Sequence, residues 1–481
     1  MTWPALVLWV LILIGLFKPA KFMLYLFFAA GTFGGLSLLP PGAAGNVPVE
    51  TVCAAVLVAK TFVGRRPLRV FLNYAVDFQK LGLLAMFSLY MVVTAFLFPR
   101  LFAGSVKVYS LNAAGNISFL SPSSANITQP IYMLVSTGMT FVFAYCGRNQ
   151  TFRNDFLHAS FFGATLLLGS GIIDMILGDA GREDVLLPFH NATYTLLNTV
   201  TIAGQKRVVG FMPEASVFGA ACCANLSFLV LNRQAYCGRL RNFGVPVVAI
   251  GLLMMIYLST STSAYIGLAA LAFVLVVKFI FEMVFIKHFT AAYFRKFLWI
   301  IGGAAAGLVV FSLLSHAYLM HVRLLLDEVL FEKNSSSSYF ERNSWTQAGI
   351  AAFWTTHGLG VGFGSLRTSN WFVNFAASTG FIGLFLFGIF ALKMVLPSRV
   401  YPDALSRHFS NGLKLALIPE FAVGLLVGTT PNPGPTMMLT LGLIFALRQK
   451  RNTAAVANAV ETTRIPRRPV KMVAGSGARV A

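Results

Sequence analysis

A chain of 481 residues with 57% hydrophobic and only 11% charged residues has too little charge to cover a water-exposed surface, which excludes a soluble globular protein. Its mean hydropathy of +0.74 and its long apolar runs favour a polytopic α-helical membrane protein, because a β-barrel would show alternating hydrophobicity. The net charge of +21 comes mostly from Lys and Arg in short loops and in the tail. This distribution is typical of cytoplasmic loops beside membrane lipids, so we expect no nucleic-acid partner.

Thirteen apolar segments follow one another, most of them near the roughly 20 residues that cross a bilayer. They lie at 2–17, 22–39, 47–62, 78–98, 130–147, 156–177, 214–232, 244–258, 263–286, 297–315, 371–396, 410–428 and 436–448. Only KPAK separates the first two, so the first could be a signal-like or re-entrant segment, and twelve spans is the alternative. We expect an all-α polytopic membrane protein of about 12-13 transmembrane helices, with residues 1–448 as a single transmembrane domain.

Basic residues fall in alternate loops, beginning with Lys18 and Lys21 and continuing with GRRPLR at 64–69, Arg148 and Arg153. The positive-inside rule places these loops in the cytoplasm, and thirteen spans then put the N-terminus outside. The tail 449–481 is basic and rich in Pro, Ala and Gly, so we expect a disordered cytoplasmic tail.

Three longer loops, 99–129, 178–213 and 316–370, fall on the opposite side, which we expect to face outside. The first is rich in Ser and Asn and nearly uncharged, so we expect a solvated loop. None of the five cysteines is predicted in these loops, so neither a disulfide framework nor a cysteine metal site is indicated. The other two loops concentrate the charges on this side and are the places to look for chemistry.

The second of these loops leads into GQKRVVGFMPEASVFG (204–219), where Lys206 and Arg207 precede Glu214 at the start of an apolar segment. An acid at a helix N-terminus is stabilised by the helix dipole, and cations beside a bilayer extend toward lipid headgroups, so both features have structural explanations. The functional alternative is a cation presented to a phosphate beside a carboxylate that accepts a proton.

The third loop predicts two helices, HVRLLLDEVLF and SYFERNSWTQAGIAAFWTTH, with the break NSSSS at 334–338 between them. Arg342 opens the second helix, where a cation is unfavourable for the dipole. The glycines of GLGVGFGS predict a tight turn rather than a nucleotide loop, because no βαβ unit precedes them. Arg367, Ser369 and Asn370 follow at the mouth of the eleventh segment, where ordinary polarity is also an explanation.

This arrangement resembles the O-antigen ligase and polymerase superfamily of bacterial envelope enzymes, also called Wzy-type. Arg342 is similar to an Arg of the large outer loop that the family carries late in the chain. The run from His357 resembles the family's Gly-rich turn, with Gly358 where Pro is usual. Gly380-Phe-Ile-Gly383 resembles the Gly-x-x-Gly step of the following helix.

The earlier loop extends the resemblance, since Arg207-Val-Val-Gly210 before Pro213 is similar to the family's Arg-x-x-Gly before a helix start. Glu214 resembles the exopolysaccharide-polymerase branch, in which an acid is common at this position. Two features depart from the family. Ser369–Asn370 stands where a His-Asn pair is usual, and STSTS at 259–263 lacks the usual Arg.

The resemblance implies a membrane glycosyltransferase that joins polyprenyl-pyrophosphate-linked oligosaccharide units into exopolysaccharide or O-antigen. It implies inverting-type transfer on the outer, periplasmic face of the bacterial cytoplasmic membrane, without a cofactor or metal. A chain-length regulator and a flippase are candidate protein partners.

Cations must hold the pyrophosphate, and we expect Arg207, Arg342 and Arg367 to do so. Ser369 and Asn370 are expected to contact the acceptor glycan. Because Ser369 cannot replace an imidazole as base, we predict that Glu214 is the general base. His357 is the next candidate, followed by His190 and His321.

Two other functions stay open. A ligase would move finished glycan onto a lipid acceptor, but the missing His at 369 and the acid at 214 favour a polymerase. A transporter or flippase should carry ionisable groups near the middle of the bilayer. Candidates for such groups are Lys278, Glu282 and Glu420.

Overall fold

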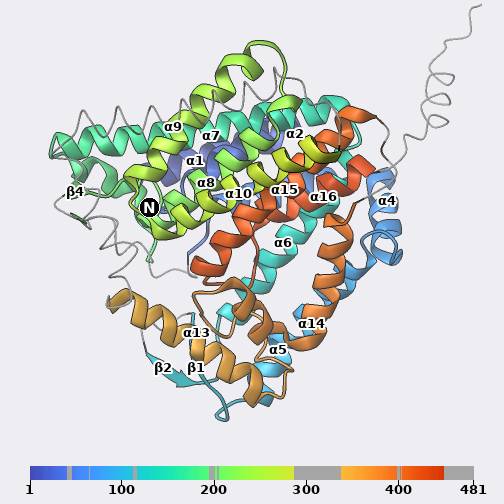
Figure 1. The fold of residues 1–481 in the computed structure, drawn as a ribbon. Helices are drawn as coiled ribbons and strands as arrows, with labels where there is room; N and C mark the ends of the chain where they lie inside the picture. The colour runs from blue at the N-terminus through green and yellow to red at the C-terminus, as the bar shows by residue number, and fades with distance from the viewer. Residues whose placement is uncertain are drawn as a thin grey trace, which may run out of the picture.

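The computed structural model of the protein describes residues 1–40, 46–63, 65–111, 116–193, 201–202, 205–285, 337–397, 401 and 403–448. Long helices dominate this part of the chain (Figure 1). In chain order they are α1 (Trp3–Phe17), α2 (Ala20–Ala30), α3 (Val49–Phe62), α4 (Arg65–Val76), α5 (Gly82–Leu101), α6 (Ala125–Cys146), α7 (Gln150–Asp179), α8 (Ala215–Leu231), α9 (Val245–Leu258), α10 (Thr262–Phe285), α13 (Ser337–Thr355), α14 (Trp371–Val395), α15 (Ala404–Val427) and α16 (Pro435–Arg448).

Only short elements accompany these helices. Two antiparallel hairpins are formed by β1 (Lys107–Tyr109) with β2 (Ile117–Phe119), and by β3 (Thr201–Ile202) with β4 (Gln205–Lys206). The turns η1 (Glu183–Phe189) and η2 (Arg233–Ala235) are 3-10 helices, and η3 (Leu240–Gly244) is a π-helical turn that continues into α9.

Seven helices in the described ranges are long and apolar enough to cross a membrane: α5, α6, α7, η3 with α9, α10, α14 and α15. The expected class, an all-α polytopic membrane protein, is confirmed. Four further apolar helices, α1, α2, α8 and α16, are shorter. The predicted segment 297–315 and the tail 449–481 lie outside the described residues, so the number of spans stays a prediction.

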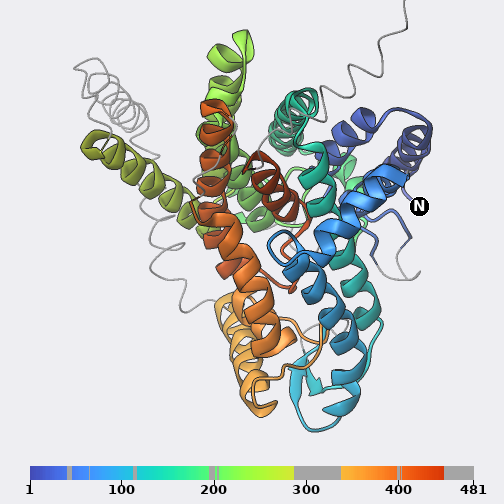
Figure 2. The same cartoon turned by 90° about the vertical axis from the view of Figure 1, so that its right-hand side faces the viewer.

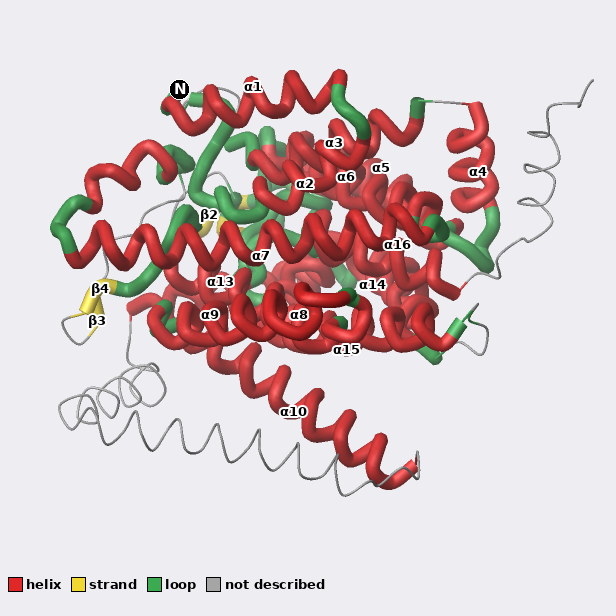
Figure 3. Tube along the Cα trace, turned by 90° about the horizontal axis from the view of Figure 1, so that it is seen from above, coloured by secondary structure: helices red, strands yellow, loops and turns green. Residues whose placement is uncertain are grey.

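The bundle is packed through its aromatic residues. Phe156 of α7 contacts Phe28, Phe143, Phe228 and Phe409, which come from four other helices. By contrast, α10 projects away from the bundle (Figures 2 and 3) and exposes large apolar side chains along its length. An exposed apolar helix of this kind suits a lipid environment.

Basic side chains tie several helix termini together at one end of the bundle. Lys21 at the start of α2 pairs with Asp155 near the start of α7 at 2.7 Å. Lys393 at the end of α14 donates to the Phe78 carbonyl at 3.1 Å, and Arg448 at the end of α16 donates to the Lys393 carbonyl. We call this part of the molecule the basic end. The helix termini that meet there are ones that the distribution of Lys and Arg predicted to lie together on the cytoplasmic side.

The loop after α5 differs from the solvated segment that we expected. Val106, Val108 and Leu120 are buried in a small second core together with Ala352 of α13 and Val361. The β1–β2 hairpin lies beside α13, at the far end of α5 and α14 (Figures 1 and 2). The expectation was wrong for these apolar residues because α13, distant in sequence, covers them.

The late loop forms the helix α13, as predicted for SYFERNSWTQAGIAAFWTTH. It begins at Ser337, so Arg342 lies in its second turn and does not open the helix as expected. The other predicted helix, HVRLLLDEVLF, lies outside the described residues. Beyond α13 the chain turns back toward the bundle.

That return is a tight turn built from glycines in the left-handed region at 358, 360, 362 and 364. It inserts against an interruption of α14 at Gly380, where φ is +64° and a Cβ would lie 2.2 Å from the Leu359 carbonyl oxygen. Backbone N–H groups of this turn are already hydrogen-bonded, since that of Val361 donates to the Ala377 carbonyl at 2.8 Å and that of Gly362 to the Ser378 carbonyl at 3.1 Å. The predicted tight turn is confirmed.

Candidate functional site

The loop before α8 is held by a carboxylate that the sequence did not single out. Asp174, near the end of α7, is 2% exposed, and its Oδ2 accepts from the backbone N–H groups of Val209 at 2.6 Å and Gly210 at 2.9 Å. Gly210 has a φ of +61° and lies close to Ser170 and Phe218, which leaves no room for a side chain. An acid inside a membrane helix was the available signal.

Arg207 reaches from this loop across the junction of α9 and α10. Its Nε donates to the Ser259 carbonyl at 3.1 Å and the Thr260 hydroxyl at 3.0 Å, and its Nη2 donates to the Thr260 carbonyl at 3.2 Å. Thr260 has a φ of +45°, which turns these oxygens out of the helices. The STSTS turn therefore orients Arg207. Its Nη1 makes no hydrogen bond to the described part of the chain.

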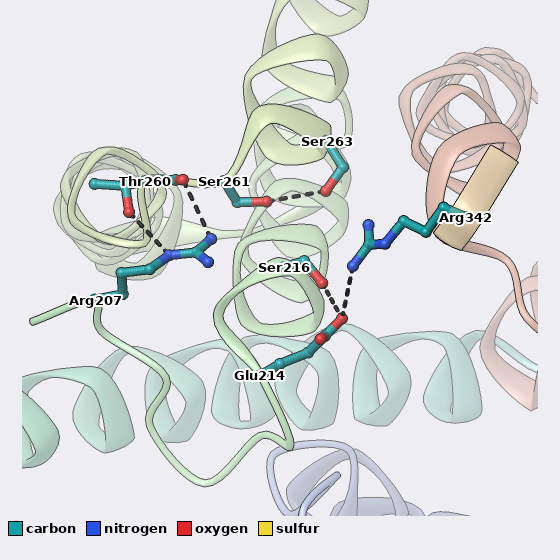
Figure 4. Close-up of polar contacts among 7 residues, drawn as sticks. All are labelled: Arg207, Glu214, Ser216, Thr260, Ser261, Ser263 and Arg342. Atoms are coloured by element: carbon teal, nitrogen blue, oxygen red, sulfur yellow. Dashed lines mark hydrogen bonds and ion pairs between the residues drawn. The ribbon is translucent and has the colours of Figure 1, made fainter. Parts of the chain in front are cut away.

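Glu214 immediately precedes α8, which confirms the predicted helix start. Its side chain makes no capping hydrogen bond to its own helix. Instead, the Oε1 atom accepts from the Ser216 hydroxyl and lies 3.6 Å from Nη2 of Arg342 (Figure 4). The carboxylate and the guanidinium are 26% and 30% exposed, so this ion pair remains accessible to a ligand.

Arg207 and Arg342 approach Glu214 from opposite sides (Figure 4). Burial lowers the pKa of the Arg207 guanidinium, whereas the Glu214 carboxylate acts to raise it and Arg342 acts to lower it. The three charges therefore interact with one another. This cluster brings together α13 and the loop before α8, which are distant in the sequence.

Arg367 belongs to the same electrostatic neighbourhood. Burial lowers the pKa of its guanidinium, the carboxylates of Glu341 and Glu214 oppose this, and Arg342 adds to it. The guanidinium lies 4.1 Å from the ring centre of Trp345 on α13, a cation–π arrangement. Its Nε is buried without a hydrogen-bond partner among the described residues. The Arg367 guanidinium is therefore coupled electrostatically to Glu341, Glu214 and Arg342.

Ser369 and Asn370 lie at the start of α14, where their neighbours explain much of their polarity. The Asn370 Oδ1 caps α14 by accepting from Val373 N–H at 3.1 Å, and Ser369 is 7% exposed. One turn later, Asn374 is fully buried and donates to the Thr429 carbonyl at 2.8 Å. The acceptor-binding role of Ser369 and Asn370 stays a prediction beside these structural roles.

The predicted reserve bases do not join the cluster. His357 follows the C-terminal end of α13 and is exposed, and a rise of 1.5 Å per residue separates it from Arg342 by roughly 20 Å. His190 packs between η1 and α8, with Nδ1 3.1 Å from the Leu186 carbonyl and Nε2 3.0 Å from the Met212 carbonyl. Both nitrogens therefore have structural partners. His321 lies outside the described residues, and the placement of Lys206 is described only for its backbone.

A cavity of about 450 Å³, here called the central cavity, lies beside this cluster among α2, α3, α7, α8, α14, α15 and α16. Met212 and Val217, which flank Glu214 in sequence, belong to its wall, but Arg207 and Arg342 do not. Its polar residues include Glu50, Asn225 and Glu420. Both arginines interact electrostatically with Glu214, but neither of them lines this cavity.

Replacing Asp174 by Ala should destabilise the loop that carries Arg207. Two buried N–H groups would lose their acceptor, at a cost of about 1–3 kcal/mol each. Asp174→Asn is the matched control, because its side-chain oxygen can still accept these bonds without the charge. We expect thermal unfolding of the purified protein to show a clearly lower midpoint for Ala than for Asn. Equal midpoints for the Ala variant and the wild-type protein would contradict this role.

Comparison with models of known protein families and with curated protein sequences returned no match. The described residues include an accessible ion pair between Glu214 and Arg342, coupled electrostatically to Arg207, and residues that flank Glu214 in sequence line a cavity with an apolar and acidic wall.

Proposed function

We propose that this chain is a membrane glycosyltransferase of the Wzy type, a polymerase that joins polyprenyl-pyrophosphate-linked oligosaccharide units into a longer glycan. The observation that carries the proposal is the ion pair between Arg342 and Glu214, to which Arg207 and Arg367 are electrostatically coupled. This cluster suits a ligand with several negative charges. It also places a proton acceptor beside that ligand.

A pyrophosphate matches the cations in charge and geometry. Guanidinium groups hold phosphate oxygens through two parallel hydrogen bonds, and such charge-assisted bonds are strong where water is partly excluded. Arg207 is already oriented by the oxygens of Ser259 and Thr260, and Arg367 is stacked on Trp345. Fixed cations of this kind stabilise charge that develops on a leaving group without first having to reorient.

The proposed transfer has one bond forming and one bond breaking. The acceptor hydroxyl oxygen bonds to the anomeric carbon of the donor sugar, and the bond from that carbon to the phosphate oxygen breaks. The electron pair leaves with the polyprenyl pyrophosphate, whose charge the arginines neutralise. The hydroxyl proton passes to Glu214. At 3.6 Å the contact between Glu214 and Arg342 exceeds hydrogen-bond length, so a phosphate can engage Arg342 and leave the carboxylate available.

The proposed sidedness follows from the basic end of the bundle. Lys21, Lys393 and Arg448 tie helix termini together there, whereas the cluster lies at the starts of α8 and α14. The positive-inside rule then favours a cytoplasmic basic end and a cluster on the outer face of a bacterial cytoplasmic membrane. Proteins that supply the lipid-linked units or set chain length are the proposed partners.

A ligase is the second candidate, because the same cations would bind the same class of donor. Removal of the gene from its host separates the two functions. A polymerase predicts loss of polymer while single lipid-linked units accumulate. A ligase predicts full-length chains that remain on the carrier lipid. Glycans separated by gel electrophoresis, with lipid-linked intermediates analysed by mass spectrometry, give the readout, and an unchanged pattern of both would overturn the proposal.

A further inference from the structure

The central cavity has an acidic wall without any matching cation. Glu50 in the first turn of α3 and Glu420 in α15 both belong to the wall, and no Lys, Arg or His of the described residues does. Within the same ranges, neither carboxylate forms an ion pair with a basic side chain. Hydrogen-bond donors of a bound molecule would therefore stabilise these two buried acids.

The rest of the wall combines aromatic and polar groups. Trp371 lies at the start of α14, with its indole N–H bound to the Pro431 carbonyl at 3.1 Å, and it packs against Phe421 of α15. Thr436 donates to Glu50 at 2.9 Å, and Asn225 of α8 adds an amide. An aromatic surface beside carboxylate and amide groups suits a ring that is apolar on its faces and rich in hydroxyl groups at its edge.

One more group in this wall lacks a partner. Thr32 is 2% exposed, belongs to the wall, and its hydroxyl makes no hydrogen bond within the described part of the chain. An unpaired buried hydroxyl is unfavourable unless another molecule supplies the bond. It is an indication of an occupant that is independent of the two acids.

We propose that the central cavity binds a sugar ring that carries no negative charge, either neutral or amino-bearing, and that Glu50 and Glu420 exclude acidic sugars. This inference rests on the proposed function, in which the ring belongs to the acceptor glycan. Met212 and Val217 connect the wall to the loop and helix start that carry Glu214. A ring in the cavity would contact residues that flank the proposed base in sequence, whereas a carboxylated ring would face two acidic side chains.

Sugar binding to the purified protein tests this directly. The protein is placed in lipid nanodiscs, because maltoside detergents have sugar headgroups that would compete. The probes are the methyl glycosides of glucose, galactose and mannose, together with glucosamine and glucuronate, at matched concentrations. Calorimetry and tryptophan fluorescence report binding. We expect at least one neutral or amino sugar to bind and glucuronate not to bind.

The double variant Glu50→Gln, Glu420→Gln supplies the sharper outcome. A hydrogen bond to a charged group contributes about 1.5–3 kcal/mol, so we expect its affinity for the bound sugar to fall by about tenfold or more. Glucuronate should now bind, because the repelling charges are gone. Glu282→Gln, which changes one acid outside the cavity wall, is the control for loss of an acidic side chain elsewhere and should bind like the wild-type protein.

Two outcomes would overturn the inference: no binding of any probe, or a heat of binding with Na⁺ or Ca²⁺ alone that both Gln substitutions abolish. The second would make the cavity a cation site. Because these measurements need no donor lipid and no polymer, they separate the two proposals. If the purified protein binds sugars selectively but removal of its gene leaves the polymer unchanged, only the polymerase proposal is overturned.

Discussion

Glu214→Gln is expected to give a folded, membrane-inserted and nearly inactive protein. Removal of a general base costs on the order of 10²–10⁴ in rate, whereas a partly exposed ion pair contributes only about 0–1 kcal/mol to stability. Gln keeps the shape of Glu and can still accept the hydrogen bond from Ser216. It removes the basicity and the charge that faces Arg342. A structural role and a catalytic role therefore predict effects of very different size.

The measurement compares polymer yield with the amount of protein in the membrane. Ser216→Ala is the matched control, because it removes the neighbouring hydroxyl and keeps the carboxylate, and we expect it to retain most activity. Normal polymer from the Gln variant at normal protein levels would remove Glu214 from the base role. His357 could not replace it, since the length of α13 separates that side chain from Arg342.

The membrane architecture was predictable because it depends on local sequence. Long apolar runs predict α5, α6, α7, α14 and α15, since each must span the bilayer with its own backbone hydrogen bonds satisfied. The basic segment at 64–69 was expected to be a loop, but most of it forms the start of α4. An amphipathic helix with arginines among its apolar residues gives no such run, so a search for spans does not find it.

The contacts that build the cluster are not local, and the sequence predicts them less well. Asp174 binds the backbone of residues that lie 35 and 36 positions later in the chain, and nothing near Asp174 in the sequence indicates that partner. The carbonyl oxygens that orient Arg207 belong to any residue type, so STSTS gives no recognisable signal for them. The sequence motifs predicted candidate site residues, and the tertiary packing determines which of these residues lie close together.

Arg342→Lys is expected to lower the polymerisation rate although it keeps the charge. An ammonium group cannot make two parallel bonds to phosphate oxygens. Loss of one charge-assisted hydrogen bond costs about 1.5–3 kcal/mol, which corresponds to roughly 10–100-fold in rate. The Arg342 side chain is partly exposed, and its ion pair with Glu214 can also form with Lys. The structure should therefore be little affected, and the loss should report on the ligand.

Arg207→Lys separates positioning from charge. Arg207 donates hydrogen bonds to three oxygens of Ser259 and Thr260, and an ammonium group cannot keep that geometry and also reach a phosphate. We expect at least as large a loss of rate, together with a lower unfolding midpoint that Arg342→Lys does not show. Initial rates with a lipid-linked repeat unit in vesicles give the comparison. Arg182→Lys, at an exposed position before η1, is the control that shows whether replacing an arginine by lysine elsewhere in the protein changes the rate. Wild-type rates in both variants would show that neither guanidinium contacts the leaving group, and the pyrophosphate site would then have to be sought elsewhere.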